Sequence, residues 1–122
     1  MLPLRPFLDS LFRTAVAAAH PATCLPPLLP PPPNTGRIIL LAAGKAAGAM
    51  AEVAEGFYLD RLKLPPERLS GIAVARHGYG RPTRVVTMIE AGHPVPDAAG
   101  LQAADRALAL ADSGATPIWC WC

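Results

Sequence analysis

The sequence predicts an α/β fold in which helices cover both faces of a mainly parallel sheet. After an initial helix, the segments follow the order strand, helix, strand, strand, helix. The strand-like segments are continuous apolar runs without polar alternation, which is typical of strands buried on both faces. The length of 122 residues is enough for one domain at most.

The first element is a helix over residues 4–19, whose apolar side chains recur at helical spacing. Pro21 pushes the preceding residue out of the helical region, so we expect the helix to end at His20. Residues 21–35 contain seven prolines. We expect them to form an extended polyproline II connector between the helix and the rest of the chain.

A short apolar run predicts a buried strand over residues 37–43, followed at once by a glycine and a lysine. A helix over about residues 46–57 comes next. Its predicted buried face has the spacing i, i+3, i+4, i+7 and i+11. The residues of this face are Ala46, Ala49, Met50, Val53 and Phe57.

Two further strands are predicted over residues 71–75 and 84–90, and a glycine-rich turn separates them. A loop over residues 92–97, stiffened by two prolines, then leads to an alanine-rich helix at about residues 98–111. Asp97 is a suitable N-cap for this helix.

Composition excludes several classes of function. The net charge of +2 is too small and too scattered for a nucleic-acid or anionic-membrane partner. No segment reaches the roughly 20 apolar residues that a membrane span needs, and we expect a cytoplasmic protein. The three cysteines form neither a disulfide framework nor a four-ligand zinc site, so no metal site is predicted.

The turn over residues 43–48 joins the first strand to the next helix. Ligands bind at this place in open α/β sheets. Its small residues expose the backbone, and Lys45 adds a mobile positive charge suited to phosphate or carboxylate. The turn is neither a P-loop nor a Gly-x-Gly-x-x-Gly fingerprint, since Ile39 and Ala46 occupy the diagnostic positions of a P-loop. A tight turn with a solvated lysine remains the alternative.

The loop over residues 92–97 places His93 and Asp97 between prolines, where they could orient a hydroxyl or carboxylate of a substrate. The alternative is that Asp97 only caps the helix and His93 is a turn residue. His77, in the preceding glycine-rich turn, is a weaker candidate. The sequence has no Gly-x-Ser-x-Gly elbow and no cysteine with a partner histidine.

Three strings in the sequence are unusual when taken together. They are Gly44-Lys45-Ala46-Ala47 followed by Met50-Ala51, Arg76-His77-Gly78-Tyr79-Gly80, and Glu90-Ala91-Gly92-His93-Pro94-Val95-Pro96-Asp97 followed by Gly100-Leu101. With them the chain resembles the type-2 glycerate kinases, which have an amino-terminal DUF4147 domain and a carboxyl-terminal MOFRL domain. Some members carry the older name hydroxypyruvate reductase. The resemblance implies a three-layer, Rossmann-like fold.

The resemblance also implies an activity, the transfer of the γ-phosphoryl group of ATP to the 2-hydroxyl of D-glycerate, with Mg²⁺. It implies that Lys45 is an active-site residue contacting either phosphate or the glycerate carboxylate, in a turn shaped by Gly44 and Gly48. It places His93 and Asp97 in the same cleft. Expected partners are therefore D-glycerate and a nucleotide, and the oligomeric state stays open.

The sequence departs from the family after about residue 111, where the family has an Asp-Leu-Val-Leu-Val-Leu strand and a glycine-rich loop. Trp is encoded only by TGG and Cys only by TGT or TGC. Read from the third base of the Ile118 codon, the DNA therefore gives Leu or Met, then Val-Leu-Val. We expect that a frame change near residues 112–117 truncated a glycerate kinase before its MOFRL domain, and that this fragment is inactive.

Two other functions remain as alternatives. One is an NAD(P)H-dependent hydroxypyruvate reductase, against which the absence of a Gly-x-Gly-x-x-Gly motif argues. The other is a non-catalytic binding module that uses the proline run over residues 21–35 to bind a partner.

Overall fold

The computed structural model describes residues 3–113 and the backbone of residues 116–121. The side chains on which the frame-change interpretation depends, beyond residue 113, lie outside this description. The helices are α1 (Leu4–Ala19), α2 (Pro21–Cys24), α3 (Ala47–Gly56) and α4 (Ala98–Ala111), and the strands are β1 (Ile38–Ala43), β2 (Leu69–Arg76), β3 (Thr87–Ala91) and β4 (Thr116–Trp121).

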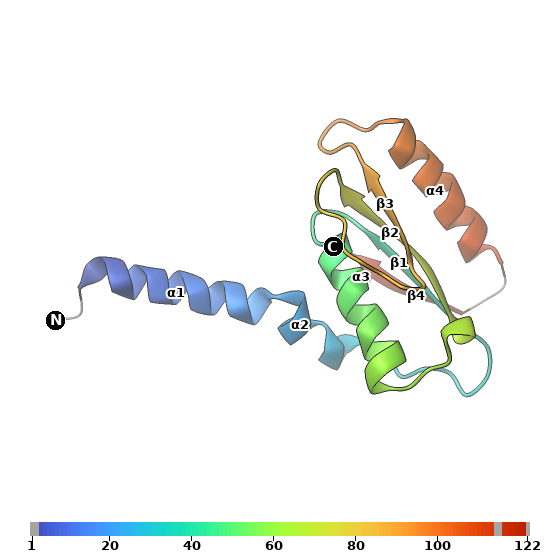
Figure 1. Cartoon of the computed structure of the whole chain (residues 1–122), viewed down its shortest axis with the longest axis horizontal. Coiled ribbons are helices and arrows are strands. Elements are labelled where there is room, and N and C mark those ends of the chain that lie inside the picture. Colours follow the sequence, from blue (N-terminus) through green and yellow to red (C-terminus); the bar gives the residue numbers. More distant parts are fainter. Residues whose placement is uncertain (1–2, 114–115, 122) are drawn as a thin grey trace.

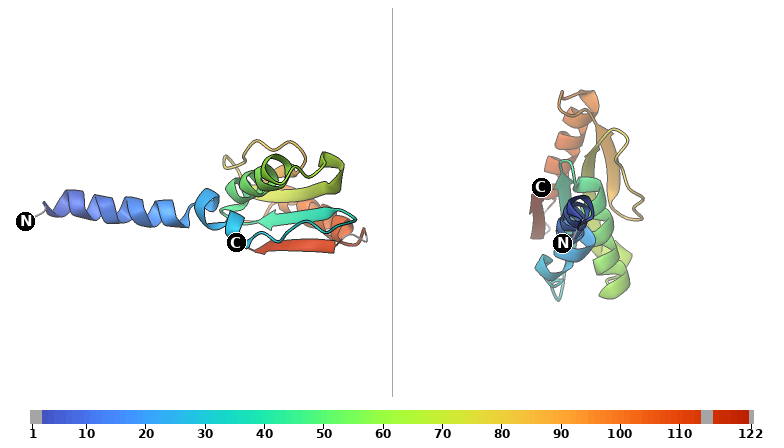
Figure 2. Two further views of the ribbon diagram at one scale, coloured as in Figure 1. Left: turned by 90° about the horizontal axis from the view of Figure 1, so that it is seen from below. Right: turned by 90° about the vertical axis from the view of Figure 1, so that its left-hand side faces the viewer.

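The four strands form one parallel sheet in the order β3-β2-β1-β4. Helix α3 packs on one face and α4 on the other, so the molecule has three layers (Figures 1 and 2). The predicted fold class is confirmed. The chain runs outward from β1 through β2 to β3, and α4 then returns it to β4 on the other side of β1. The direction of winding therefore reverses between β1 and β4.

The core between α3 and the sheet is built from small residues on the helix and larger ones on the strands. Ala47, Ala51 and Ala54 of α3 are fully buried, and Tyr58 of the following π-helical turn, η2 (Phe57–Arg61), is buried as well. The predicted face of this helix is therefore wrong by about one residue. The alanines allow the helix backbone to approach the sheet closely, and the longer side chains stand at the margin of the contact. These marginal residues are Met50, Val53 and Phe57.

The second face of the sheet is also apolar. Ile39 of β1 and Ile72 of β2 are buried beneath α4, whose Ala103 is fully buried. Burial therefore runs along β1 and β2 without strict alternation, as expected for a sheet covered on both faces.

The proline-rich segment is not the extended connector that its composition predicts. Its first part forms α2 and the short 3-10 helix η1 (Pro26–Leu28), while Leu25 and Leu29 are buried in the core. Proline is favourable at the first position of a helix, which explains how helical turns form here. Two of the later prolines are held through their carbonyl groups, because the Tyr58 hydroxyl donates to Pro30 O at 2.9 Å and Arg68 donates to Pro33 O at 2.6 Å.

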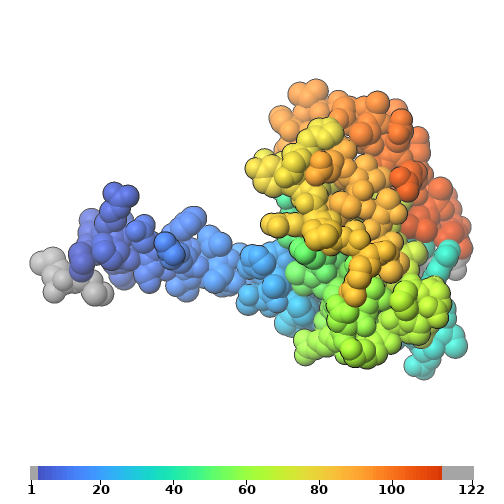
Figure 3. Space-filling view, viewed as in Figure 1, coloured from blue at the N-terminus to red at the C-terminus, as the bar shows by residue number. Residues whose placement is uncertain are grey.

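Helix α1 projects away from the rest of the molecule (Figures 1 and 3). It has no buried residue, and its apolar stripe, which includes Leu4 and Phe12, is exposed. The predicted bounds of this helix are correct. Within the described part of the chain, no helix is both long and apolar enough to span a membrane.

Candidate functional site

A small cavity of about 160 Å³ lies where β1, β2 and β3 end. Its walls come from the carboxyl ends of these strands, the loop after β3 and the start of α4. The lining residues are Ala43, Gly44, Val74, Ala75, Arg76, Ala91, Gly92, His93, Pro96 and Gly100. This is the edge of a parallel sheet at which α/β proteins bind their ligands.

The turn after β1 borders this cavity. Gly44 has a φ of +123°, a conformation that side chains disfavour, and its N–H donates to Val74 O at 3.3 Å. Lys45 is exposed, and among the described residues its ammonium group has no hydrogen bond or ion pair. No side chain caps the start of α3, and its first N–H, that of Ala47, donates to Gly44 O at 3.2 Å within the turn.

Gly48 fixes the distance between this turn and the glycine-rich turn after β2. A Cβ atom at residue 48 would lie 2.5 Å from the Tyr79 carbonyl oxygen. No side chain fits at this separation, so glycine is required for the two turns to pack together.

Asp97 holds together the loops that follow β2 and β3. Its Oδ2 lies 2.8 Å from His77 Nε2, and its Oδ1 accepts a hydrogen bond of 3.0 Å from Gly100 N. The hydrogen bond from the Gly92 backbone, with those from His77 and Gly100, lowers the pKa of Asp97 to about 2. Asp97 is therefore both the predicted helix cap and an ionised partner of His77.

Glu90 near the end of β3 plays a similar part for the glycine-rich turn. Its carboxylate accepts a 2.8 Å hydrogen bond from Gly80 N. This hydrogen bond and a second from Gly78 lower the pKa of Glu90. Both carboxylates near the cavity thus have partners within the chain.

The structure distributes the predicted site residues in two groups. Gly44 and His93 line the cavity, whereas Lys45, Gly48 and Asp97 flank it without lining it. His93 is exposed and does not contact Asp97 through any described hydrogen bond; the histidine that pairs with Asp97 is His77.

Sequence reasoning missed Arg76 as a site residue. Arg76 is the last residue of β2 and lines the cavity, with its guanidinium carbon 3.5 Å from the centre of the Tyr79 ring. A basic residue at the carboxyl end of a buried apolar strand was the signal that could have identified it.

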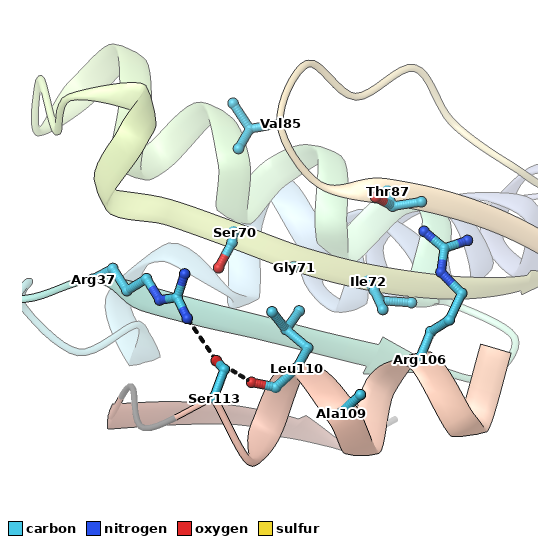
Figure 4. A pocket seen from close by; sticks show the side chains of 10 residues that line it. All are labelled: Arg37, Ser70, Gly71, Ile72, Val85, Thr87, Arg106, Ala109, Leu110 and Ser113. Atoms are coloured by element: carbon cyan, nitrogen blue, oxygen red, sulfur yellow. Dashed lines mark hydrogen bonds between the residues drawn. The ribbon is translucent and has the colours of Figure 1, made fainter.

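A second, larger hollow of about 540 Å³ lies at the opposite end of the sheet, beneath the last turns of α4 (Figure 4). Arg37 donates to Ser113 Oγ at 2.6 Å there, and Arg106 lies on the other side (Figure 4). The strands begin rather than end here, so this hollow lies away from the edge where α/β sheets bind their ligands.

The described residues offer no ready metal site. They contain no group of three or more His, Cys, Asp or Glu side chains arranged to hold a metal ion.

Residues 7–117 match the family whose description is "Domain of unknown function (DUF4147)". An Agrobacterium vitis protein, provisionally named hydroxypyruvate reductase, is 37% identical over 105 residues, covering 86% of this chain and 22% of that protein. The D-glycerate 2-kinase of Thermotoga maritima is 30% identical over 110 residues, covering 89% of this chain and 25% of that enzyme.

The fold matches solved structures too. A crystal structure of glycerate kinase from Thermotoga maritima superposes with a TM-score of 0.68 at 31% identity, covering 90% of this chain and 25% of that chain. These matches confirm the resemblance to type-2 glycerate kinases and also contain the name hydroxypyruvate reductase. The chain spans about a quarter of the length of these relatives.

Proposed function

Because the chain belongs to the DUF4147 family, we propose that it forms one wall of the substrate cleft of an ATP-dependent D-glycerate 2-kinase. The observation that carries the proposal is the position of the Lys45 turn. It lies at the carboxyl end of β1, next to the point where the winding of the sheet reverses and beside a cavity lined by glycine.

Lys45 would bind an anionic group of the nucleotide or of the acid substrate. Phosphoryl transfer depends mainly on the positioning of the reactants and the neutralisation of charge on the transferred group. A mobile ammonium group without a partner in the described chain suits this task, and Gly44 and Gly48 keep the surrounding surface open.

His77 and His93 would bind or orient substrate groups at the neighbouring loop. With its pKa lowered to about 2, Asp97 stays ionised at neutral pH and is a weak base. We therefore assign it the task of holding His77 and the loop in place, and not that of removing the proton from the substrate hydroxyl.

The described residues include no cluster of three candidate ligands that would hold a metal ion by themselves. We therefore assign none of these residues the role of a metal ligand.

Hydroxypyruvate reduction is the second candidate, favoured by the name of the Agrobacterium vitis relative. The turn after β1 argues against it. It contains Gly44 and Gly48 but not the three glycines with which dinucleotide-binding proteins receive a pyrophosphate.

The test is ligand binding by the 122-residue chain, followed by backbone amide NMR. We expect D-glycerate and ATP to shift amide signals of residues 43–48 and NADH to shift none. Lys45→Met should weaken ATP or D-glycerate binding about tenfold, because one charge-assisted contact is lost. Lys63→Met is the matched control, as Lys63 is the only other lysine and follows the far end of α3.

Two results would count against the proposal: binding of NADH at this turn, or equal weakening by both lysine variants. The chain alone should give no ADP release with D-glycerate, since it spans about a quarter of its relatives.

A further inference from the structure

The side chain of Arg76 is unusual among the arginines that border the sheet. Its Nε atom is buried and has no hydrogen-bond partner. The guanidinium group makes no ion pair with any described residue either, although it lies against the Tyr79 ring. A buried polar group without a partner is energetically unfavourable, so its presence calls for an explanation.

Two arginines at the opposite end of the sheet have well-defined partners. Arg68 donates to Gly36 O at 2.7 Å and to Pro33 O at 2.6 Å, and Arg84 forms hydrogen bonds of 2.9 and 2.8 Å with the Asp60 carboxylate. The other described arginines without a hydrogen-bonding or ionic partner are exposed to solvent. Arg76 differs from them because its Nε atom is buried.

The acidic residues near the cavity form no ion pair with Arg76. Asp97 is bound to His77 and Gly100, and Glu90 is bound to Gly80. The two carboxylates that the sequence places in this region are thus committed to the loops. Arg76 therefore has no ion-pair partner among the described residues.

The remaining walls suit a small anion. Three of the lining residues, Gly44, Gly92 and Gly100, have no side chain, which lets a ligand reach the backbone. A side chain at residue 92 would collide with the Val95 carbonyl oxygen, so this wall is fixed as glycine. The volume of about 160 Å³ is below the 300–1,000 Å³ that is common for drug-sized ligands.

We propose that Arg76, held flat against Tyr79, binds a small oxyanion in this cavity and is the residue that selects an acidic substrate. The ligand is a carboxylate of a short organic acid or a single phosphate group. The planar guanidinium group presents N–H donors along its edge, which matches the geometry of either oxyanion. Stacking on the ring of Tyr79 orients this edge without occupying it.

This inference rests on the proposed function, since it names the group that would receive the acid in the same cleft. Lys45 and Arg76 make separate contributions, however, and their variants separate the two ideas. A loss with Arg76→Gln but not with Lys45→Met would support the oxyanion site and overturn the proposed role of Lys45. The opposite pattern would overturn the oxyanion site alone.

The experiment titrates the 122-residue chain with three probes, namely D-glycerate, inorganic phosphate and glycerol, and follows its amide NMR signals. Glycerol has the size of glycerate but no carboxylate. We expect binding of D-glycerate, of phosphate or of both, but not of glycerol. Arg76→Gln should weaken the binding about tenfold, and Arg106→Gln, which removes an equal charge at the other end of the sheet, should leave it unchanged.

Tyr79→Leu provides a second variant in case Arg76→Gln disturbs the fold. Tyr79 is 52% exposed, so its replacement should preserve folding while freeing the arginine from its stacked position. We expect about a threefold loss of affinity, since the charge remains but its orientation is lost. Glycerol binding as tight as that of D-glycerate, no binding of either anion at millimolar concentration, or unchanged affinity in Arg76→Gln would overturn the proposal.

Discussion

Charged side chains serve different purposes at the two ends of the sheet. At the amino-terminal end Arg68 and Glu55 satisfy backbone groups of the chain, and both are fully engaged in doing so. At the carboxyl end Lys45 and Arg76 have no hydrogen-bonding or ionic partner among the described residues. The comparison indicates that Arg68 and Glu55 stabilise the fold, whereas Lys45 and Arg76, unlike the carboxylates of Asp97 and Glu90 beside them, are available for a ligand.

Glu55 is the strongest case at the amino-terminal end. The side chain is 3% exposed and accepts hydrogen bonds from the backbone N–H groups of Arg84, Val85 and Val86 at 2.6–2.8 Å. These residues belong to the segment that crosses from β2 to β3 without a helix. Glu55 therefore takes the place of the secondary structure that this connection lacks.

The largest expected effect comes from Glu55→Ala. The change leaves three backbone donors unsatisfied, and the free energy of unfolding should fall by about 3 kcal/mol or more. Urea unfolding followed by circular dichroism measures this loss. Glu52→Ala, on the exposed side of the same helix, is the control and should change the stability little. Equal effects of the two substitutions would contradict the role given to Glu55.

Lowering the pH should have the next largest effect on stability, since it protonates carboxylates at both ends of the sheet. Burial opposes the ionisation of Glu55, but the backbone hydrogen bonds outweigh it and lower its pKa below 4.5. Hydrogen bonds lower the pKa of Asp97 from 3.8 to about 2. Both groups stabilise the fold above their unfolded-state pKa values, and this contribution disappears as the pH falls through the folded-state values.

Urea unfolding at a series of pH values between 7 and about 2 would reveal this dependence. We expect Asp97→Asn to flatten the part of the curve between pH 3.8 and about 2. A variant that follows the wild-type curve throughout this range would show that the Asp97 carboxylate is not stabilised by its loop.

Arg68→Gln should have a smaller effect, a loss of about 1 kcal/mol, because two hydrogen bonds to carbonyls of the proline-rich segment disappear. Calorimetric unfolding is a suitable measurement. The result tests whether the hydrogen bonds from Arg68 keep the proline-rich segment in place. A change in stability below the error of the method would indicate that the buried side chains of Leu25 and Leu29 are sufficient.

Arg76→Gln should have the smallest effect on stability, about 0.5 kcal/mol, since the stacking on Tyr79 is lost but no hydrogen bond or ion pair is. Comparing Arg68→Gln with Arg76→Gln thus distinguishes an arginine that stabilises the fold from one that binds a ligand. If Arg76→Gln destabilises the chain as much as Arg68→Gln, the contrast between the two ends is wrong.

Local patterns were sufficient to predict much of the fold. Apolar runs identified β1 and β2, and Asp97 marked the start of α4 correctly. The predicted strand over residues 84–90 begins later, at Thr87, because Glu55 binds the backbone of the residues before it. That interaction joins residues 29–31 positions apart and has no local signature.

The candidate site was also predictable only where local sequence patterns determine it. The Lys45 turn follows a strand directly, so its place at the sheet edge could be read from the sequence. The pairing of His77 with Asp97 could not, because the two residues are 20 positions apart and meet only when β2 and β3 lie side by side. The unpartnered state of Arg76 depends in turn on which carboxylates those loops have already engaged.

Helix α1 and the sheet should differ in their stability against unfolding. With no buried residue, its formation is an equilibrium of its own, and an isolated helix of this length is marginal in water. Its amide hydrogens should exchange with solvent far faster than those of β1, because exchange in β1 requires the sheet to open. A protease would therefore cut within residues 4–19 while the sheet stays intact.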